Sequence, residues 1–146
     1  MSSTTIRVKG AEEARRALGA AEGRARTAVG RAVVKTLIQG EAHMKRLLSQ
    51  PGRGRLYGAH RASAPGQPPA VDTGTYRASW RHRFGGIGSA SPTGDVYTEQ
   101  ERGPWLEFGT ARMAARPHAG PVSERMAEDF RDNTVEALRA TSRGGT

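Results

Sequence analysis

The sequence predicts an α+β domain, in which a long N-terminal helix and a C-terminal helix pack on a small, mostly antiparallel sheet. Three observations lead to this fold class. Apolar residues recur at helical spacing from Ala11 to about Ser49 and again after Pro121, as in amphipathic helices. Residues 81–109 are divided by Gly and Pro into short segments, which is typical of strands joined by turns. Residues 51–71 are rich in Gly and Pro and predict a long loop.

The length and composition are those of one modest domain. The chain has 146 residues, of which 36% are apolar and 5% aromatic, so it can bury only a small core. We expect one domain over residues 1–141 and a disordered tail at 142–146. The absence of cysteine excludes disulfides and thiolate metal sites. No apolar run is long enough to cross a bilayer and residues 1–5 lack a signal-peptide pattern, so we expect synthesis in the cytoplasm and no membrane partner.

The N-terminal region predicts one short strand and one long helix. Residues 6–10 alternate apolar and basic side chains up to a glycine, as an edge strand does. Because glycine weakens a helix by about 1 kcal/mol relative to alanine, we expect a break near residues 19–23 and a long helix from there to about Ser49, where a Pro-Gly pair ends it. The apolar residues near one face of this helix are Leu18, Ala21, Ala25, Val29, Ala32, Leu37, Met44 and Leu48.

The segment after this helix predicts an exposed loop and then a short helix. Residues 51–71 have no apolar face, and a structureless loop of this length is usually functional or mobile. We expect the loop to be mobile in the free protein and to become ordered against a partner. Asp72 suits the N-cap of a helix over residues 73–80, because its carboxylate accepts hydrogen bonds from the first backbone N–H groups.

The rest of the chain predicts three short strands and a second long helix. The strands cover residues 83–87, 95–99 and 105–108, with turns that contain Gly and Pro between them. The C-terminal helix starts at Pro121, because proline is favourable at the first helical position. Its apolar face is expected to consist of residues that recur every four positions: Val122, Met126, Phe130, Thr134 and Leu138.

Two aromatic residues in the last predicted strand are candidate core and interface residues. Trp105 and Phe108 are separated by an odd number of positions, so in a strand their side chains lie on opposite faces of the sheet. We expect Phe108 to fill the core and Trp105 to contact a partner. Glu107 lies between them and is expected to form an ion pair with Arg112 or Arg116, within one subunit or between two.

The tripeptide Asp72-Thr73-Gly74 matches the signature of aspartic proteases. That chemistry needs two carboxylates that share a proton, so this chain would act as a homodimer with Asp72 on the two-fold axis. The preceding residues 64–70 are rich in Pro instead of forming an apolar strand, which favours a structural role for Asp72. An aspartic-protease-like dimer is therefore a remote alternative.

No other pattern of polar residues predicts catalysis, a cofactor or a metal ion. The four histidines are scattered and lack the i, i+4 spacing or the nearby carboxylate of a metal site. The serines lie outside any nucleophile motif, and residues 52–55 lack the Lys-Ser or Lys-Thr of a phosphate-binding loop. We therefore expect a protein that is not an enzyme.

The net charge of +9 is unevenly distributed along the chain. Residues 15–83 contain 14 Arg or Lys against 3 Asp or Glu, whereas residues 95–136 contain 5 against 9. Such a chain can bind nucleic acid through its basic part, or pair its basic surface with the acidic surface of another copy.

The loop residues Arg53, Arg55 and Arg61 are candidate contacts to DNA or to a neighbouring subunit. We expect most arginines to meet acidic neighbours and a minority to touch phosphates without reading sequence. The expected acidic cluster is Glu124, Glu128, Asp129 and Asp132.

Two motifs carry a family resemblance. The first is Val71-Asp72-Thr73-Gly74, which follows the Pro/Gly loop. The second is Trp105-Leu106-Glu107-Phe108-Gly109-Thr110, which is followed by Ala115-Arg116-Pro117 and the closing helix. In this order and spacing, over about residues 65–130, the chain resembles the tail-component (tail-completion, or neck) family of long-tailed double-stranded DNA phages. It departs from the family at His118, where a large apolar residue usually follows Arg-Pro, and at residues 102–105, where Arg-Gly-Pro-Trp replaces the usual Tyr-Ala-Pro.

The resemblance implies a structural virion protein at the head–tail joint, synthesised in the host cytoplasm. It implies a homo-oligomeric ring around the DNA channel, with six-fold symmetry favoured over twelve-fold, because this family lies where a twelve-fold portal meets a six-fold tail. The implied partners are neighbouring neck rings (an adaptor or stopper, a tail terminator or the tail tube) and packaged double-stranded DNA through non-specific contacts. The motif residues would have structural or interface roles. The alternative from a different class is a small basic nucleic-acid-binding protein.

Overall fold

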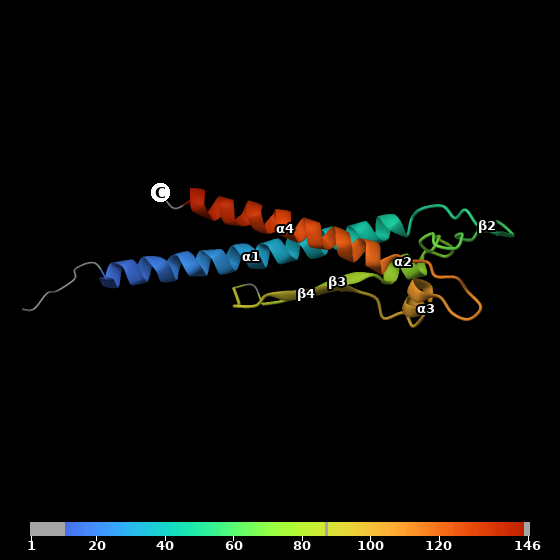
Figure 1. Cartoon of the computed structure of the whole chain (residues 1–146), viewed down its shortest axis with the longest axis horizontal. Helices are drawn as coiled ribbons and strands as arrows, with labels where there is room; N and C mark the ends of the chain where they lie inside the picture. The colour runs from blue at the N-terminus through green and yellow to red at the C-terminus, as the bar shows by residue number, and fades with distance from the viewer. Residues whose placement is uncertain (1–10, 87, 145–146) are drawn as a thin grey trace, which may run out of the picture.

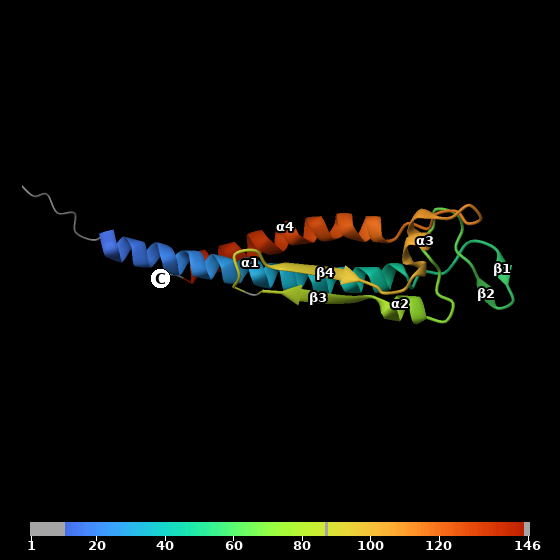
Figure 2. The same ribbon diagram turned by 90° about the horizontal axis from the view of Figure 1, so that it is seen from below.

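The computed structural model describes residues 11–86 and 88–144. Two long helices, α1 (Ala11–Leu47) and α4 (Ala119–Arg143), form an elongated body and run antiparallel (Figure 1). A hairpin of β3 (Arg81–Gly85) and β4 (Thr93–Tyr97) lies along α1, on a different side from α4 (Figure 2). The other elements lie where α1 ends and α4 begins. They are β1 (Leu56–Tyr57), β2 (His60–Arg61), α2 (Thr75–Ser79) and α3 (Arg102–Phe108).

This architecture confirms the predicted α+β fold, with long N- and C-terminal helices and small antiparallel sheets. Two of the predicted strands, at residues 83–87 and 95–99, correspond to β3 and β4, each displaced by two residues toward the N-terminus. Residues 6–10 and Ile87, which are also predicted to be in strands, lie outside the described residues. We call residues 49–79 and 98–118 together the end lobe.

Helix α1 is continuous over 37 residues, about 55 Å at 1.5 Å per residue, so the predicted break near residues 19–23 is wrong. Alanine, glutamate and arginine around the glycines are strong helix formers. Ion pairs one turn apart, Arg16 with Glu12 and Arg26 with Glu22, add a few tenths of a kcal/mol each. The side chains of residues 12–24 are all exposed, and this part of α1 extends beyond the end of α4 (Figure 1).

The core lies where the helix pair, the β3–β4 hairpin and the end lobe meet. Its buried cluster consists of Met44, Leu48, Tyr76, Trp80 and Val122. Burying a large apolar side chain contributes about 1.5–3 kcal/mol, so a cluster of this size gives a thin core for a chain of this length. Partly buried residues surround it: Leu47, Val96, Leu106, Ala119 and Met126.

Two glycines allow other elements to approach α1 closely. A Cβ atom on Gly40 of α1 would collide with the Met126 side chain of α4. A Cβ atom on Gly94 of β4 would collide with the Leu37 side chain of α1. A Cβ atom on Gly94 would also lie 2.8 Å from the backbone carbonyl oxygen of Arg83, so glycine is needed there, whereas at Gly40 only the flexible Met126 side chain has to shift.

Polar pairs run along the contact between α1 and α4, and we call them the polar seam. The predicted stripe of α4 has a strict four-residue period, which drifts by about 40° per step on a helix of 3.6 residues per turn. Val122 is buried, but Phe130 and Leu138 are exposed, and Asp129 and Asn133 are buried instead. The seam consists of His43 with Asp129 (2.9 Å), Asn133 with Thr36 (3.0 Å) and Gln39 (2.7 Å), and Lys35 with Glu136 (2.7 Å).

The third predicted strand, residues 105–108, is wrong, because these residues belong to helix α3. Pro104 lies in the first turn of α3, where its missing N–H costs no helical hydrogen bond. Gly109 ends the helix with a φ of 77°, and its N–H donates to the Trp105 carbonyl oxygen at 2.9 Å. Its ψ of 179° places it outside the left-handed helical conformation, in a region of positive φ that only glycine adopts readily.

About half of residues 51–71 are exposed, and the segment contains the small β1–β2 hairpin. Leu56 pairs with Arg61 and Tyr57 pairs with His60. The Gln67 side chain closes the base of the segment, because its Oε1 accepts from the backbone N–H groups of residues 53 and 64, both at 2.9 Å. The segment therefore has local structure, and its mobility in the free protein stays a prediction.

The C-terminal helix is confirmed, with its first residue two positions earlier than predicted. It continues to Arg143, so residues 142–143 of the predicted tail are helical, whereas residues 145–146 lie outside the described residues. Among the helices of the described residues, none has the length and apolar character needed to cross a membrane.

Candidate functional site

The end lobe is organised around His118, which immediately precedes α4. Its side chain is 1% exposed and its Nε2 lies 2.6 Å from the Tyr76 hydroxyl. The rings of Tyr76 and Trp80 meet the imidazole edge-on, at centroid distances of 5.6 and 5.8 Å. His118 therefore fills a core position directly after the Arg-Pro step, where the resemblance leads to a large apolar residue.

The hydrogen bonds of this network define a donor and an acceptor. Burial raises the pKa of the Tyr76 hydroxyl to about 12, so the phenol is protonated at neutral pH and donates to His118 Nε2 in the tautomer that carries its proton on Nδ1. The His118 Nδ1 lies 2.8 Å from the Arg116 carbonyl oxygen and 3.0 Å from Glu107 Oε2. A phenol that keeps its proton is suited to holding the imidazole in place, and it is a poor nucleophile.

The Glu107 carboxylate binds the start of α4. It accepts hydrogen bonds from the backbone N–H groups of His118 (2.8 Å), Ala119 (2.8 Å) and Gly120 (3.0 Å). These N–H groups have no partner within the helix, and the helix dipole favours a negative charge there. Within one chain, the predicted ion pair of Glu107 with Arg112 or Arg116 is therefore wrong.

The environment of Glu107 changes its acidity in two directions. Burial acts to raise the pKa of the carboxyl group, but the three backbone N–H groups and the nearby His118 stabilise the charged form. These contacts together outweigh burial, so the pKa of Glu107 is lowered. The carboxylate is ionised at neutral pH and links α3 to α4.

The residues after Glu107 form a turn that returns the chain to the core. At Gly109 the positive φ of 77° disfavours any other residue, and an added Cβ would collide with the Met113 carbonyl oxygen. The Thr110 N–H donates to that same oxygen at 2.8 Å. The Gly-Thr part of the second motif is thus structural.

Arg116, which follows this turn, is hydrogen-bonded to two neighbouring segments. Its backbone N–H donates to the Leu106 carbonyl oxygen at 2.7 Å, and its guanidinium donates to the Ala64 carbonyl oxygen. Pro117 follows and is half-buried. The Arg-Pro step therefore joins α3 to the segment that carries the β1–β2 hairpin.

Gly74, and not Asp72, is the N-cap of α2. Gly74 has a φ of 79°, and α2 has no side-chain cap hydrogen bond. The Asp72 side chain is largely exposed, and its Oδ1 lies 3.9 Å from His60 Nδ1. Thr73 Oγ1 lies 2.9 Å from Thr75 Oγ1. The predicted cap at Asp72 is wrong because the chain turns through the left-handed conformation of Gly74 before the helix starts.

A cleft of about 580 Å³ lies beside the His118 network, between α2, β4, α3 and the start of α4. Phe108 lines it and is 82% exposed, and Trp105 of the same helix is 55% exposed. Because residues three apart on a helix share a face, Trp105 and Phe108 form one surface, which we call the aromatic ridge. The prediction that Phe108 fills the core is wrong, and the interface role of Trp105 stays a prediction.

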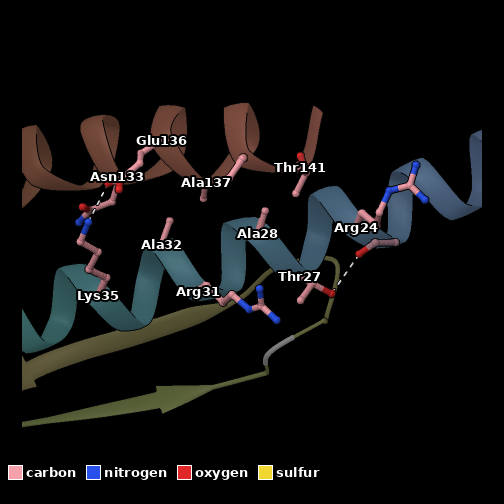
Figure 3. Close-up of a pocket in the computed structure, with 12 residues that line it drawn as sticks. Arg24, Thr27, Ala28, Arg31, Ala32, Lys35, Asn133, Glu136, Ala137 and Thr141 are labelled. Carbon is pink, nitrogen blue, oxygen red and sulfur yellow. Dashed lines mark hydrogen bonds and ion pairs between the residues drawn. The ribbon is translucent and has the colours of Figure 1, made fainter. Parts of the chain in front are cut away.

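A second cavity, of about 590 Å³, lies between α1 and α4 beyond the Lys35–Glu136 pair (Figure 3). We call it the helix groove. Its lining includes the small side chains of Ala28, Ala32 and Ala137, and it also includes the basic residues Arg24, Arg31 and Lys35. Small side chains on both helices leave the space open between them.

The expected acidic cluster on α4 is partly used within the chain. Asp129 is buried and pairs with His43 at 2.9 Å and with Arg125 at 3.2 Å. Glu128 lies 3.4 Å from Arg125. Among the described residues, Glu124 and Asp132 have no ion-pair partner, and both are exposed. Of the four residues of the acidic cluster, only these two can pair with a neighbouring subunit without breaking an ion pair within the described chain.

Sequence reasoning missed Tyr76, Trp80 and His118 as the centre of the end lobe. The i, i+4 spacing of Tyr76 and Trp80 on a predicted helix is a packing signal that identifies a buried face. His118 gives no comparable signal, because a lone histidine next to proline is compatible with any exposed loop.

Within residues 11–86 and 88–144, no group of three or more His, Asp or Glu side chains is arranged to hold a metal ion. Comparisons with protein-family models, with curated proteins and with solved structures found no match.

Proposed function

We propose that this chain is a structural virion protein of the phage neck or tail, and that copies form a ring at the head–tail joint. The observation that carries the proposal is the large uncovered surface of a subunit with a thin core. The family resemblance of the two motifs supplies the biological setting. Both motifs lie in the end lobe, where their residues form turns and the cap of α4.

The projecting part of α1 supports self-association. Helices gain most of their stability from packing one face, yet residues 12–24 are exposed and Leu18 is 71% exposed. The helix groove begins next to this segment, since Arg24 is among its lining residues. A neighbouring copy packed there would cover both. Head-to-tail contacts of this kind close into a ring when the rotation allows, with six-fold symmetry favoured over twelve-fold.

The aromatic ridge supports contact with a neighbouring ring of the neck. Tryptophan and other large aromatic side chains contribute most of the binding energy at protein interfaces. Helix α3, which carries both residues of the ridge, lies at the opposite end of the molecule from the projecting part of α1 (Figure 1). One subunit thus has two separate contact surfaces. One is for other copies of this chain, and the other is for an adaptor or stopper ring, a tail terminator or the tail tube.

Purified virions provide the test of this function. We expect the protein in virions at the neck, and we expect averaged particle images to show a closed ring with more than two copies. The variant Phe108→Ser should form the ring but fail to join heads to tails. The control Val135→Ser, which changes another exposed apolar residue, should join them normally. Absence from virions, or a closed two-fold dimer, would contradict the proposal.

The second candidate is a small basic nucleic-acid-binding protein, and the net charge of +9 favours it. Such a protein binds duplex DNA as a purified monomer, with an affinity that falls steeply with salt. A neck subunit binds DNA weakly until it is assembled. The remote protease reading predicts peptide hydrolysis that is lost in Asp72→Asn.

A further inference from the structure

The β1–β2 hairpin is a basic projection of the end lobe. Residues 42–71 contain five Arg or Lys and no Asp or Glu. Three of these basic residues, Arg53, Arg55 and Arg61, are exposed and lie on the hairpin or at its base. In the part of the chain that the structure describes, none of the three has an ion-pair partner. A positive surface of this kind needs an anionic partner from outside the subunit.

The hairpin presents its arginines on both of its faces. The register pairs Leu56 with Arg61, so the Arg61 side chain shares a face with Leu56, and Arg55, one position before β1, lies on the other face. The Arg61 guanidinium also donates to the Gly54 carbonyl oxygen at 3.1 Å. The Arg55 guanidinium lies over the Tyr57 ring at 5.3 Å.

Close packing fixes the base of the hairpin. A Cβ atom on Gly52 or Gly54 would collide with the backbone of residues 61–63, so the two sides of the base are in contact. Ser63 is buried there. The three guanidinium groups are therefore presented from a defined turn instead of a structureless chain.

Another copy of this chain offers few acidic groups to meet them. Of the 14 Asp and Glu residues, most already lie within ion-pair distance of a basic group of the same chain, including Glu41, Asp95 and Asp129. Among the described residues, five have no such partner: Glu13, Glu99, Glu101, Glu124 and Asp132. They are distributed over the projecting part of α1, the end lobe and α4, and do not form one patch.

We infer that the hairpin arginines contact the phosphate backbone of double-stranded DNA without reading its sequence. Guanidinium groups bind phosphate oxygens through paired hydrogen bonds. Sequence reading requires an ordered element that presents side chains to base edges, and two-residue strands supply no such surface. Stacking on single-stranded bases requires a series of free aromatic rings, whereas Tyr57 is the one aromatic residue of the hairpin and already contacts Arg55. The inference rests on the proposed function, because a ring around the channel brings the hairpin near packaged DNA.

The test compares full-length variants in binding to a random-sequence DNA duplex labelled for fluorescence anisotropy, over a series of salt concentrations. The hairpin variant changes Arg53, Arg55 and Arg61 to Ala. The control variant removes the same charge from α4 by changing the exposed Arg131, Arg139 and Arg143 to Ala. Each phosphate contact contributes about 0.9 to the magnitude of the slope of log affinity against log salt concentration. In the hairpin variant this magnitude should therefore fall by up to about 2.7 relative to the wild type. In the control variant the slope should stay close to that of the wild type.

Further variants separate charge from folding. The single variants Arg55→Ala and Arg61→Ala should each lose about 0.9 of slope, and a triple Arg→Lys variant should keep most of the slope. Circular dichroism checks that each variant is folded. Equal losses in the hairpin and control variants, or no detectable binding by the wild type at low salt, would overturn the inference.

Ring assembly distinguishes this inference from the proposed function. If the hairpin variant binds DNA like the wild type but no longer forms rings in native mass spectrometry, the arginines bind protein and the inference is wrong. If DNA binding depends on the hairpin but the protein is absent from virions, the phosphate contact is supported and the neck function fails.

Discussion

Glu107 connects two helices through a single carboxylate. It lies in the last turn of α3 and accepts three hydrogen bonds from the first backbone N–H groups of α4. A charged group is effective there, because the unpaired N–H groups and the helix dipole both favour negative charge. Glu107 also lies between Trp105 and Phe108 in the chain, so the orientation of the aromatic ridge depends on it.

The lowered pKa of Glu107 predicts a pH-dependent contribution to stability. A carboxyl group with a lowered folded-state pKa contributes stability that is present above its unfolded-state pKa, here about 4.5, and is lost as the pH falls through the folded-state pKa. Glu107→Gln should therefore be less stable than the wild type at pH 7 by about 1–2 kcal/mol. The difference should shrink in acid. Thermal unfolding from pH 7 to pH 2.5 measures it, and a difference that does not change with pH would contradict the role of the charge.

The geometry of the first motif predicts different roles for Asp72 and Gly74. Because Asp72 is exposed and caps no helix, Asp72→Ala and Asp72→Asn should each change the free energy of unfolding by less than about 0.5 kcal/mol. Gly74→Ala should cost about 1 kcal/mol or more, because alanine disfavours the positive φ. Chemical denaturation of the three variants checks this order. Wild-type peptide hydrolysis that disappears in Asp72→Asn would instead favour the protease alternative.

At the scale of elements, local patterns predicted the long helices and the β3–β4 hairpin but not α3. Helical periodicity identified α1 and α4, and turn glycines identified the hairpin. The run Trp105-Leu106-Glu107-Phe108 fits a strand as well as a helix, because four residues between turns carry too little periodicity to distinguish the two. Distant contacts decide its structure: Glu107 binds the start of α4, and Leu106 accepts a hydrogen bond from Arg116.

The candidate site was predicted less well than the fold for the same reason. The sequence identifies the two motifs, but the contact that organises the end lobe joins Tyr76 and His118, which are 42 positions apart in the chain. Nothing in either segment indicates the other. Similarly, polar pairs occupy part of the α1–α4 contact where the sequence predicts an apolar stripe, because Asp129 and Asn133 bond to His43, Thr36 and Gln39 of α1.

The β1–β2 hairpin allows a direct test of the predicted mobility of residues 51–71. Residues 55–59 at the tip of the hairpin are all exposed, so local opening should be easier there than at the packed base or in the helical core. Trypsin should cleave the free subunit first after Arg53, Arg55 or Arg61 and should cleave the assembled ring there more slowly. Mass spectrometry of the early fragments measures both. Equal resistance in the monomer and the ring would show that the segment is a fixed part of the fold.

At the scale of the whole molecule, the remaining charges predict part of the contact between copies. Glu124 and Asp132 are the members of the acidic cluster without an internal partner, and Arg24 and Arg31 line the helix groove. If copies pair these surfaces, the double variant Glu124→Lys with Asp132→Lys should weaken ring formation, because like charges would then meet. Reversing Glu99 and Glu101 in the end lobe is the control and should have little effect.

Native mass spectrometry over a range of salt concentrations measures this assembly. Combining the α4 reversal with Arg24→Glu and Arg31→Glu should restore part of the ring. Rings of unchanged stability in the α4 reversal variant would exclude pairing through these two carboxylates.

The projecting part of α1 gives the most direct prediction about assembly. The Leu18 side chain is 71% exposed, so a change there should affect contacts between copies and leave the subunit fold intact. Leu18→Asp should keep the unfolding transition of the isolated subunit within about 0.5 kcal/mol but abolish or strongly weaken the ring. Ala20→Asp is the matched control, since residue 20 lies about 200° around the same exposed helix. It should assemble normally. If both variants assemble like the wild type, the exposed face of α1 is solvent-facing in the ring and the contact between copies must lie elsewhere.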